Sequence, residues 1–382
     1  MYKRLLEKPL KGKQSFFLFG PRGTGKTSWL KAYVPNGFYI DLLNQEVFFD
    51  LLKNPHKIEA MIPPGFEGWI IIDEVQKIPE LLNEVHRMIE SYRYRFILTG
   101  SSARTLKRKG TNLLAGRALY YNMFPLTALE LGSDFEIKRA LRFGHLPMVY
   151  SKEVDPKKYL DAYIRVYLQE EVMQEGLVRN IAAFARFLET ASFSQGSMLN
   201  ITEVAREASI ERKTAEDYFQ IAEDLLLATR IPVFTKRAKR KTVAHPKFYF
   251  FDVGVYRALR PMGPFDVPEE AEGVALESLV FQELQAINHY FELEYETFFW
   301  RTTDQLEIDF VLYGPKGLLA IEIKRAKNIN EGDLKAMKAF QADYPNAKLY
   351  FFYGGNQRLY FNQIEAIPIA EALLTLPKLL GY

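Results

Sequence analysis

The sequence contains no cysteine, and this absence excludes several kinds of chemistry at once. With 0 Cys among 382 residues, the chain can form no disulfide, no cysteine-ligated zinc site and no thiol nucleophile. The five histidines show no metal-ligand spacing. The sequence also lacks an uncharged run of about 18 residues and an apolar N-terminal segment of signal-peptide length. These absences predict a soluble cytoplasmic protein without a membrane span.

The chain also has no large excess of positive or negative charge, because the formal net charge is only +3. The whole chain therefore gives no argument for nucleic-acid binding, and any such argument has to be local. Hydrophobic residues make up 48% of the sequence, which is enough to form cores and excludes general disorder. There is no internal repeat, and 382 residues suffice for two or three domains.

The most informative stretch is FFLFGPRGTGKT, residues 16–27. An apolar strand, a glycine-rich turn and a helix start predict a backbone nest that binds phosphate oxygens. Lys26 is expected to reach the β- and γ-phosphates, and Thr27 to offer its hydroxyl to Mg²⁺. The alternative is a structural glycine-rich loop. The predicted ATP-binding residues here are Gly20, Pro21, Arg22, Gly23, Thr24, Gly25, Lys26, Thr27 and Ser28.

A second buried strand, residues 69–73, ends in Asp73 and is followed by Glu74. Such a pair suits Mg²⁺ binding through water by Asp73 and polarisation of the attacking water by Glu74. The alternative is an acidic pair at a helix N-terminus. After the next strand, Thr99 and Ser101 are expected near the γ-phosphate, with helix capping as the alternative.

Arg117 follows Gly116 and is a candidate catalytic arginine supplied by a neighbouring subunit, which predicts a homo-oligomer. A lone arginine is otherwise a surface charge.

Short apolar strands alternate with helical segments up to about residue 122, and this alternation predicts a parallel sheet covered on both faces. The candidate strands are residues 16–19, 38–41, 69–73, 96–99 and 118–122, in a P-loop ATPase domain over residues 1–126.

A helical connector and a winged helix-turn-helix domain are predicted over residues 127–262. Two helices, 201–208 and 211–227, are joined by a turn and followed by strand-like segments 231–234 and 248–251. The segment between these strands carries five basic residues and no acid, which predicts phosphate contacts to DNA with low sequence specificity. A solvated loop is the alternative. The basic residues are Lys236, Arg237, Lys239, Arg240 and Lys241.

In residues 263–382, two alternating segments flank the turn Gly-Pro-Lys-Gly and predict a hairpin. If Tyr313 pairs with Leu318, Asp309 faces Glu322, and Glu307 faces Lys324. Directly opposed carboxylates destabilise a sheet unless a cation compensates them, and Mg²⁺ or Mn²⁺ suits carboxylate oxygens. Metal ligands are therefore predicted at Asp309 and Glu322, with Glu277 from a helix and Lys324 as a catalytic residue.

The order of these motifs resembles the AAA+-type ATPases of bacteria and archaea that carry a C-terminal DUF4143 region. The resemblance rests on FLFGPRGTGKT, WIIIDEVQKIPEL, ILTGSSA and LLAGRALYYNMFPLTALEL, and it continues to the C-terminal segments EIDFV and IEIK. The latter also resemble the core of PD-(D/E)XK nucleases, whose acidic helix residue, metal Asp and Glu-x-Lys match Glu277, Asp309, Glu322 and Lys324. The implied fold is an α/β P-loop sheet, then a winged-helix domain, then a restriction-endonuclease-like α/β domain.

Two functions remain open from the sequence. The first is a DNA-associated ATPase that hydrolyses ATP with Mg²⁺ and remodels or cuts DNA. Its catalytic residues are expected to be Lys26, Glu74 and Arg117, with Asp309, Glu322 and Lys324 for cutting. The second is a nucleotide-gated signalling or defence switch, in which the winged helix and C-terminal domain bind protein. A nuclease-like domain with a Glu307–Lys324 surface ion pair and no catalysis is the alternative for the last domain.

Overall fold

A computed structural model of the chain describes residues 2–104, 106, 114, 116–168, 172, 178, 180–236, 240–263 and 267–382. It divides into two compact units. The first unit comprises Met1–Pro125 and Asp224–Leu227, and the second comprises Leu126–Glu223 and Ala228–Tyr382. The first expected boundary, after residue 126, lies beside this division. The second, after residue 262, has no counterpart in it, so the three-domain division stays a prediction.

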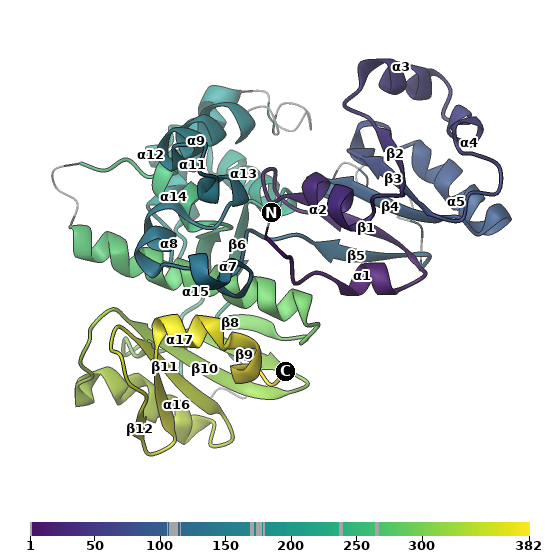
Figure 1. The fold of residues 1–382 in the computed structure, drawn as a ribbon. Coiled ribbons are helices and arrows are strands. Elements are labelled where there is room, and N and C mark those ends of the chain that lie inside the picture. The colour runs from purple at the N-terminus through teal and green to yellow at the C-terminus, as the bar shows by residue number, and fades with distance from the viewer. Residues whose placement is uncertain are drawn as a thin grey trace. The chain divides into compact units, whose positions relative to one another are not determined.

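The first unit contains a five-stranded parallel sheet of order β2-β3-β4-β1-β5 (Figure 1). Each strand lies within one residue of its expected limits. Because all the strands are parallel, their carboxyl ends meet at one edge of the sheet, where ligands bind in open α/β folds. The strands are β1 (Ser15–Phe19), β2 (Phe38–Asp41), β3 (Trp69–Asp73), β4 (Arg95–Gly100) and β5 (Ala118–Asn122).

The strands β1, β3 and β4 are buried on both faces, as their continuous apolar sequences require, whereas Leu119 and Tyr120 of the edge strand β5 are exposed. Phe17 and Phe19 of β1 belong to a core cluster with Leu81, Val85 and other side chains of the following helices. Phe16 alternates with them and points to the opposite face, where it is fully buried as well. The helices are α1 (Lys8–Lys11), α2 (Lys26–Tyr33), α3 (Gln45–Lys53), α4 (Lys57–Met61) and α5 (Leu81–Tyr92).

The second unit begins with helices that contain the predicted helix-turn-helix segment. Its two helices are joined by a turn in which Ser209 takes a left-handed backbone conformation (φ 54°). The helices are α7 (Ala128–Leu131), α8 (Ile137–Phe143), α9 (Pro156–Ala162), α11 (Ile181–Ser192), α12 (Ile201–Glu207), α13 (Arg212–Asp224) and α14 (Val253–Leu259).

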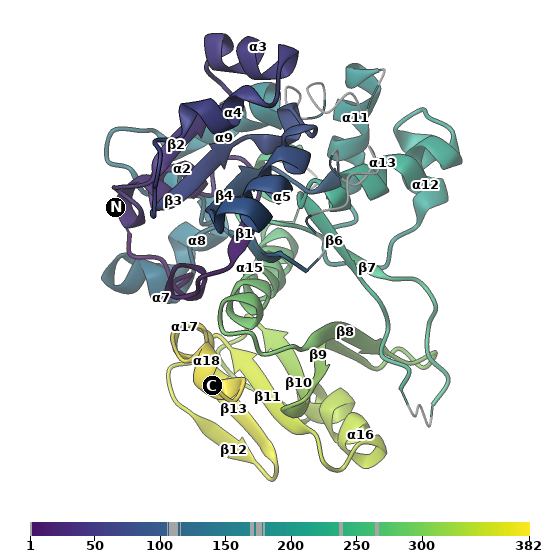
Figure 2. The same cartoon turned by 90° about the vertical axis from the view of Figure 1, so that its right-hand side faces the viewer.

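An antiparallel ribbon of β6 (Ala228–Ile231) and β7 (Lys247–Phe250) follows this segment. The expectation that the first ribbon strand spans residues 231–234 is wrong. β6 ends before Pro232, which has no N–H to donate to a ladder. The chain instead extends along β8 (Glu296–Arg301), where the Phe234 N–H donates to the Phe299 carbonyl (2.7 Å). Figure 2 shows this segment running beside the C-terminal sheet.

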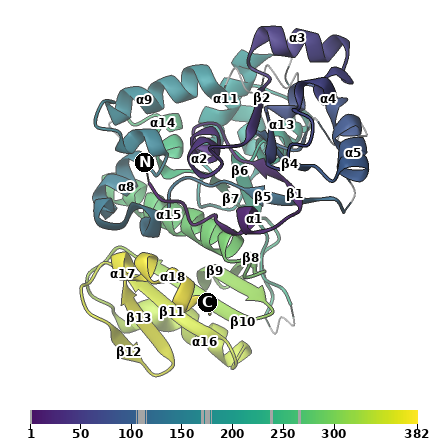
Figure 3. The same ribbon diagram turned by 45° about the vertical axis from the view of Figure 1, so that its right-hand side comes forward.

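The C-terminal sheet has six strands in the order β12-β13-β11-β10-β9-β8 and mixes parallel with antiparallel pairs. The predicted hairpin register is confirmed, because Tyr313 pairs with Leu318. The long helix α15 runs alongside this sheet (Figure 3). Its Phe281 stacks on Phe310 of β9. The remaining elements are α15 (Pro268–Tyr290), β9 (Glu307–Gly314), β10 (Gly317–Lys324), α16 (Lys335–Asp343), β11 (Lys348–Tyr353), β12 (Leu359–Phe361), β13 (Ile364–Pro368), α17 (Ile369–Leu374) and α18 (Leu376–Leu379).

No helix in the described part of the chain is long and apolar enough to cross a membrane.

Candidate functional site

The loop between β1 and α2 has the backbone geometry that a phosphate nest requires. Gly23 and Gly25 have positive φ angles of 82° and 95°, where a side chain is disfavoured. Gly20 is constrained by space, since a Cβ there would lie 2.3 Å from the Met123 carbonyl oxygen. Gly25 precedes α2, so the first N–H groups of this helix lie next to the loop.

Lys26 lies at the start of α2, and its ammonium is folded into the loop. Its Nζ donates to the carbonyl oxygens of Gly20 (2.6 Å) and Pro21 (3.2 Å), and the residue is 7% exposed. A buried ammonium at a helix N-terminus among glycines is suited to phosphate binding. The loop therefore fits the nucleotide that the sequence implies.

Asp73 ends β3 and is the centre of a cluster of hydroxyl groups. Thr27 donates to its Oδ2 at 3.0 Å, Tyr39 also donates to Oδ2, and Thr99 donates to Oδ1. The expected juxtaposition of Thr27, Asp73 and Thr99 is thus present. Hydroxyl donors hold the carboxylate in one orientation, and carboxylate and hydroxyl oxygens are the ligands that suit Mg²⁺.

Tyr39 was not expected from the sequence. It lies on β2, where it pairs with Ile71 of β3, and its hydroxyl meets the Asp73 carboxylate. Burial, together with the hydrogen bond to Asp73, raises the pKa of Tyr39 above its usual value. The tyrosine therefore remains a neutral hydrogen-bond donor at physiological pH. The tyrosine hydroxyl between the apolar residues Phe38 and Ile40 was the one available signal.

Glu74 follows β3 in a left-handed backbone conformation (φ 61°, ψ 45°). Its carboxylate accepts a hydrogen bond from Gln76 Nε2 (2.6 Å), while its N–H donates to Thr99 Oγ1 (3.4 Å). Thr99 thereby links the Asp73 side chain to the Glu74 backbone. Non-glycine residues in this conformation are uncommon and cluster at functional sites.

Ser28, Ser101 and Arg117 are the remaining residues that the sequence predicts for the nucleotide site. Ser101 is buried after β4, and Ser28 lies in the first turn of α2. Arg117 forms an ion pair with Glu90 of α5 in the same unit. Its expected role toward a neighbouring subunit stays a prediction.

Arg4 supports the glycine-rich loop from outside the motif. The residue is 3% exposed, and its guanidinium donates to the carbonyl oxygens of Thr24 (2.7 Å) and Phe124 (2.7 Å). It therefore fixes the loop backbone to the chain after β5. Nothing in the local sequence around Arg4 indicates this contact, because its partners lie 20 and 120 residues away.

The basic segment after β6 is partly neutralised within the second unit. Lys236 pairs with Glu296 of β8 (2.6 Å), and Arg240 pairs with Asp343 of α16 (2.8 Å). Lys236, Arg240 and Lys241 are all exposed. The expected DNA contacts at Arg237 and Lys239 lie outside the described residues.

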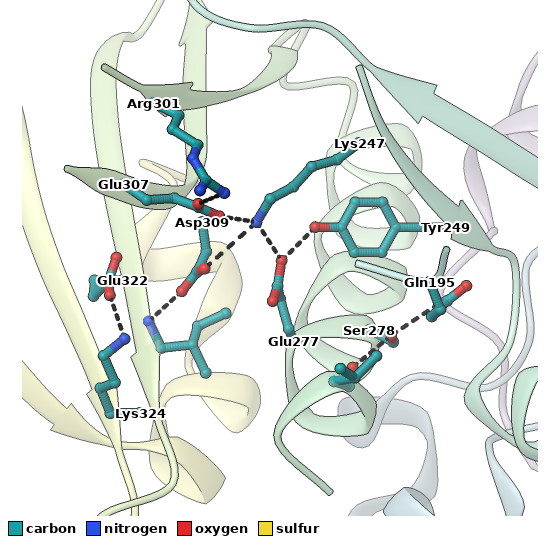
Figure 4. Close-up of polar contacts among 12 residues, drawn as sticks. Gln195, Lys247, Tyr249, Glu277, Ser278, Arg301, Glu307, Asp309, Glu322 and Lys324 are labelled. Atoms are coloured by element: carbon teal, nitrogen blue, oxygen red, sulfur yellow. Dashed lines mark hydrogen bonds and ion pairs between the residues drawn. The ribbon is translucent and has the colours of Figure 1, made fainter. Parts of the chain in front are cut away.

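The predicted carboxylate site of the C-terminal sheet surrounds a lysine (Figure 4). Lys247 of β7 is 2% exposed, and its Nζ lies 2.9 Å from Glu277 Oε1, 2.5 Å from Glu307 Oε1 and 3.7 Å from Asp309 Oδ1. Tyr249, two residues along the same strand, donates to Glu277. Strand alternation places Lys247 and Tyr249 on one face, and a lysine in a buried phenylalanine-rich strand was the signal for it.

The charge pairs in this cluster differ from the expected ones. Glu307 pairs with Lys247 and with Arg301 (2.7 Å), and Lys324 pairs with Glu322 (2.8 Å). The alternative of a Glu307–Lys324 ion pair is therefore wrong. The charge on Glu307 is already compensated by the lysine and arginine, so it does not require Lys324.

Burial and the neighbouring carboxylates of Glu322 and Glu277 raise the pKa of Asp309 well above its usual range. Burial likewise raises the pKa of Glu322 to about 7. Burial acts to lower the pKa of Lys247, but the carboxylates, Glu277 first, outweigh it and hold this pKa above its usual value. Lys247 is therefore charged.

The described residues contain no group of three or more histidines, aspartates or glutamates arranged to hold a metal ion. Glu277, Asp309 and Glu322 thus do not form the expected metal site. Two of these carboxylates instead face the Lys247 ammonium, and Asp309 Oδ2 accepts the Ile323 N–H (2.8 Å). A divalent metal does not fit this arrangement, since a cationic side chain fills the space between its ligands.

Comparison with known families assigns a domain to each part of the chain. Residues 12–132 match the AAA domain family, 134–266 match a domain of unknown function (DUF8612), and 272–372 match another domain of unknown function (DUF4143). The expected combination of a P-loop ATPase domain with a C-terminal DUF4143 region is therefore confirmed.

Two uncharacterized relatives span most of the chain. A protein of Mycobacterium tuberculosis is 26% identical over 370 residues, covering 94% of this chain and 80% of its own length. One of Methanocaldococcus jannaschii is 24% identical over 371 residues, covering 87% and 80%. Among solved structures, the Aeropyrum pernix Orc1 protein in complex with DNA aligns with a TM-score of 0.24 and 16% identity, over 67% of this chain and 89% of that one.

Proposed function

We propose that this P-loop ATPase with a C-terminal DUF4143 region hydrolyses ATP with Mg²⁺ at the carboxyl edge of its five-stranded sheet, and couples hydrolysis to the remodelling of bound DNA. The observation that carries the first part is the convergence of Lys26, Thr27 and Asp73 at the end of the glycine-rich loop. These residue types at this edge form the phosphate and magnesium sites of P-loop enzymes.

Each residue then has a distinct task. Bound Mg²⁺ neutralises charge on the phosphate oxygens. When ATP binds, the Lys26 ammonium leaves the carbonyl oxygens of Gly20 and Pro21 and donates to phosphate oxygens instead. Thr27 and Asp73 would hold the Mg²⁺ ion. Thr99 fixes Asp73, and Glu74 orients the attacking water once its carboxylate has left Gln76.

Arg117 acts in trans in this proposal, so hydrolysis requires contact between subunits. The guanidinium must exchange Glu90 for a neighbour's γ-phosphate, and such arginines contribute about 10³–10⁵ in rate where they act. A homo-oligomer is therefore the working form.

DNA binding is proposed for the basic segment between β6 and β7, next to the predicted winged helix. Its support is the exposure of Lys236, Arg240 and Lys241 on a segment without acidic residues. Contacts of this type are to phosphate and carry little sequence information.

DNA cutting is not part of the proposal, because the carboxylate cluster of the C-terminal sheet does not fit a divalent metal. Lys247 lies within 3.7 Å of carboxylate oxygens of Glu277, Glu307 and Asp309.

A second candidate function is a nucleotide-gated switch that binds protein. The observation that favours it is the pairing of Lys236 with Glu296 and of Arg240 with Asp343, which reduces the positive charge offered to phosphate.

The deciding experiment is the ATP hydrolysis rate with and without duplex or single-stranded DNA, with Lys26→Ala as the inactive control. Stimulation that disappears in a Lys236→Gln, Arg240→Gln, Lys241→Gln variant supports the DNA-associated ATPase. A slow rate that is indifferent to DNA supports the switch, and absence of Lys26-dependent hydrolysis rejects both.

A further inference from the structure

The carboxylate cluster formed by Glu277 of α15 and by Glu307 and Asp309 of β9 contains a cation, Lys247, from a distant part of the chain. Lys247 belongs to β7, 30 residues before Glu277 and 60 or more before Glu307 and Asp309. It lies within the segment that matches DUF8612 (134–266), whereas all three carboxylates lie in the DUF4143 segment (272–372). One family segment therefore supplies a counter-ion to the carboxylates of the other.

The ammonium of Lys247 is directed into the cluster. It donates a hydrogen bond to Glu277 Oε1 (2.9 Å) and lies 2.5 Å from Glu307 Oε1 and 3.7 Å from Asp309 Oδ1. With 2% exposure, Lys247 has almost no access to water, so these carboxylates replace its hydration. Figure 4 shows Lys247 reaching across from its strand into the space between α15 and β9.

The surrounding contacts fix the carboxylates around the lysine. Tyr249 donates to Glu277, Arg301 donates to Glu307 (2.7 Å), and the Ile323 N–H donates to Asp309 (2.8 Å). Each carboxylate is therefore held by a second donor and cannot turn away easily. Carboxylate oxygens are also the ligands that hard divalent cations take, although with the ammonium in place these three carboxylates are not arranged to hold a metal ion.

We propose that Lys247 is the built-in counter-ion of this cluster and occupies the position of a divalent metal. In the native protein the cluster therefore binds no metal. Its ion pairs connect β7, which carries Lys247, to the C-terminal sheet. Removal of the ammonium converts the cluster into a Mn²⁺ site formed by Glu277, Glu307 and Asp309.

The test counts Mn²⁺ bound by the nucleotide-free full-length protein, read from the electron paramagnetic resonance signal of free Mn²⁺. Four proteins are compared: wild type, Asp309→Asn, Lys247→Met, and the double variant. Any Mn²⁺ held near Asp73 is common to all four, so each pairwise difference isolates the C-terminal cluster. Lys241→Met, which removes an exposed lysine from the preceding segment, is the matched control.

Wild type and Asp309→Asn are expected to bind equal amounts of Mn²⁺. Lys247→Met should bind one more ion than the double variant, and saturating Mn²⁺ should restore a Tm lowered on the order of 10 °C by the loss of the buried partner. Lys241→Met should match wild type.

Two results overturn the proposal. One is a Mn²⁺ ion in wild type that disappears in Asp309→Asn, since lysine and metal would then coexist. The other is a folded Lys247→Met protein that binds no more Mn²⁺ than the double variant. If Lys247→Met does not fold, the comparison of wild type with Asp309→Asn decides alone. The result is independent of the ATPase proposal, because ATP hydrolysis is not measured.

Discussion

Substitution of Tyr39 by Phe tests whether its hydroxyl positions the Asp73 carboxylate for catalysis. The change removes one of three hydroxyl donors and leaves Thr27 and Thr99 in place. A hydrogen bond to a charged group contributes about 1.5–3 kcal/mol. If this contribution is realised in the transition state, kcat/KM for Mg-ATP falls roughly 10- to 150-fold, at about 1.4 kcal/mol per factor of ten.

The assay is steady-state ATP hydrolysis at several Mg²⁺ concentrations, together with ATP affinity measured without Mg²⁺. Since Tyr39 acts through Asp73, affinity without Mg²⁺ should be unchanged and the loss should concern Mg-dependent turnover. The matched control is Tyr33→Phe at the end of α2, whose ring stacks on Trp29 (centroids 5.6 Å apart). Wild-type kcat/KM in Tyr39→Phe, or an equal loss in Tyr33→Phe, would refute the positioning role.

Four further predictions follow from the site and the fold. Glu74→Gln should retain ATP binding and slow single-turnover hydrolysis by about 10²–10⁴, and wild-type turnover would remove Glu74 from the mechanism. Mixing Arg117→Ala with Lys26→Ala protein should restore part of the activity that neither has alone, which a strictly monomeric protein could not do. Lys241→Gln should reduce the slope of log K against log salt for duplex DNA by about 0.9, and an unchanged slope leaves Lys241 outside the interface. Burial raises the pKa of Glu283 above its ordinary value of 4.5, so the folded state binds this proton more tightly; its contribution to stability is therefore greatest below pH 4.5 and is lost as the pH rises through the folded pKa. The Tm of Glu283→Gln should therefore rise relative to the Tm of wild type between pH 5 and pH 8. A Tm difference that stays constant over this range would contradict the raised pKa of Glu283.

The parts of the fold that were predicted correctly depend on short-range patterns. The strands of the first unit are apolar runs bounded by turns, and the glycine-rich loop specifies the strand before it and the helix after it. The register of the C-terminal hairpin followed from its turn, because Tyr313 and Leu318 flank the stretch Gly-Pro-Lys-Gly, whose two glycines also pair with each other. In each case the interacting residues are close in sequence.

The parts that sequence reasoning missed depend on long-range contacts. Tyr39 reaches Asp73 from 34 residues away, and Arg4 reaches Phe124 from 120 residues away. Neither residue lies in a recognised motif. A tyrosine in a strand or an arginine near the N-terminus is common, so neither indicates a functional contact. The position of β6 follows from Pro232, because its missing N–H ends the strand despite the apolar pattern of residues 231–234.

The carboxylate cluster shows how far an electrostatic argument reaches without a structure. The register required a cation near Asp309 and Glu322, and the need for one was physically sound, because opposed carboxylates repel. The structure meets that need with three cations, which are Lys247, Arg301 and Lys324. They face four carboxylates, which are Glu277, Glu307, Asp309 and Glu322. One negative charge remains in excess, and a single proton on Asp309 or Glu322 neutralises it, in line with their raised pKa values. Charge balance thus predicts the sign of a counter-ion, whereas only the tertiary structure decides whether a metal or a lysine supplies it.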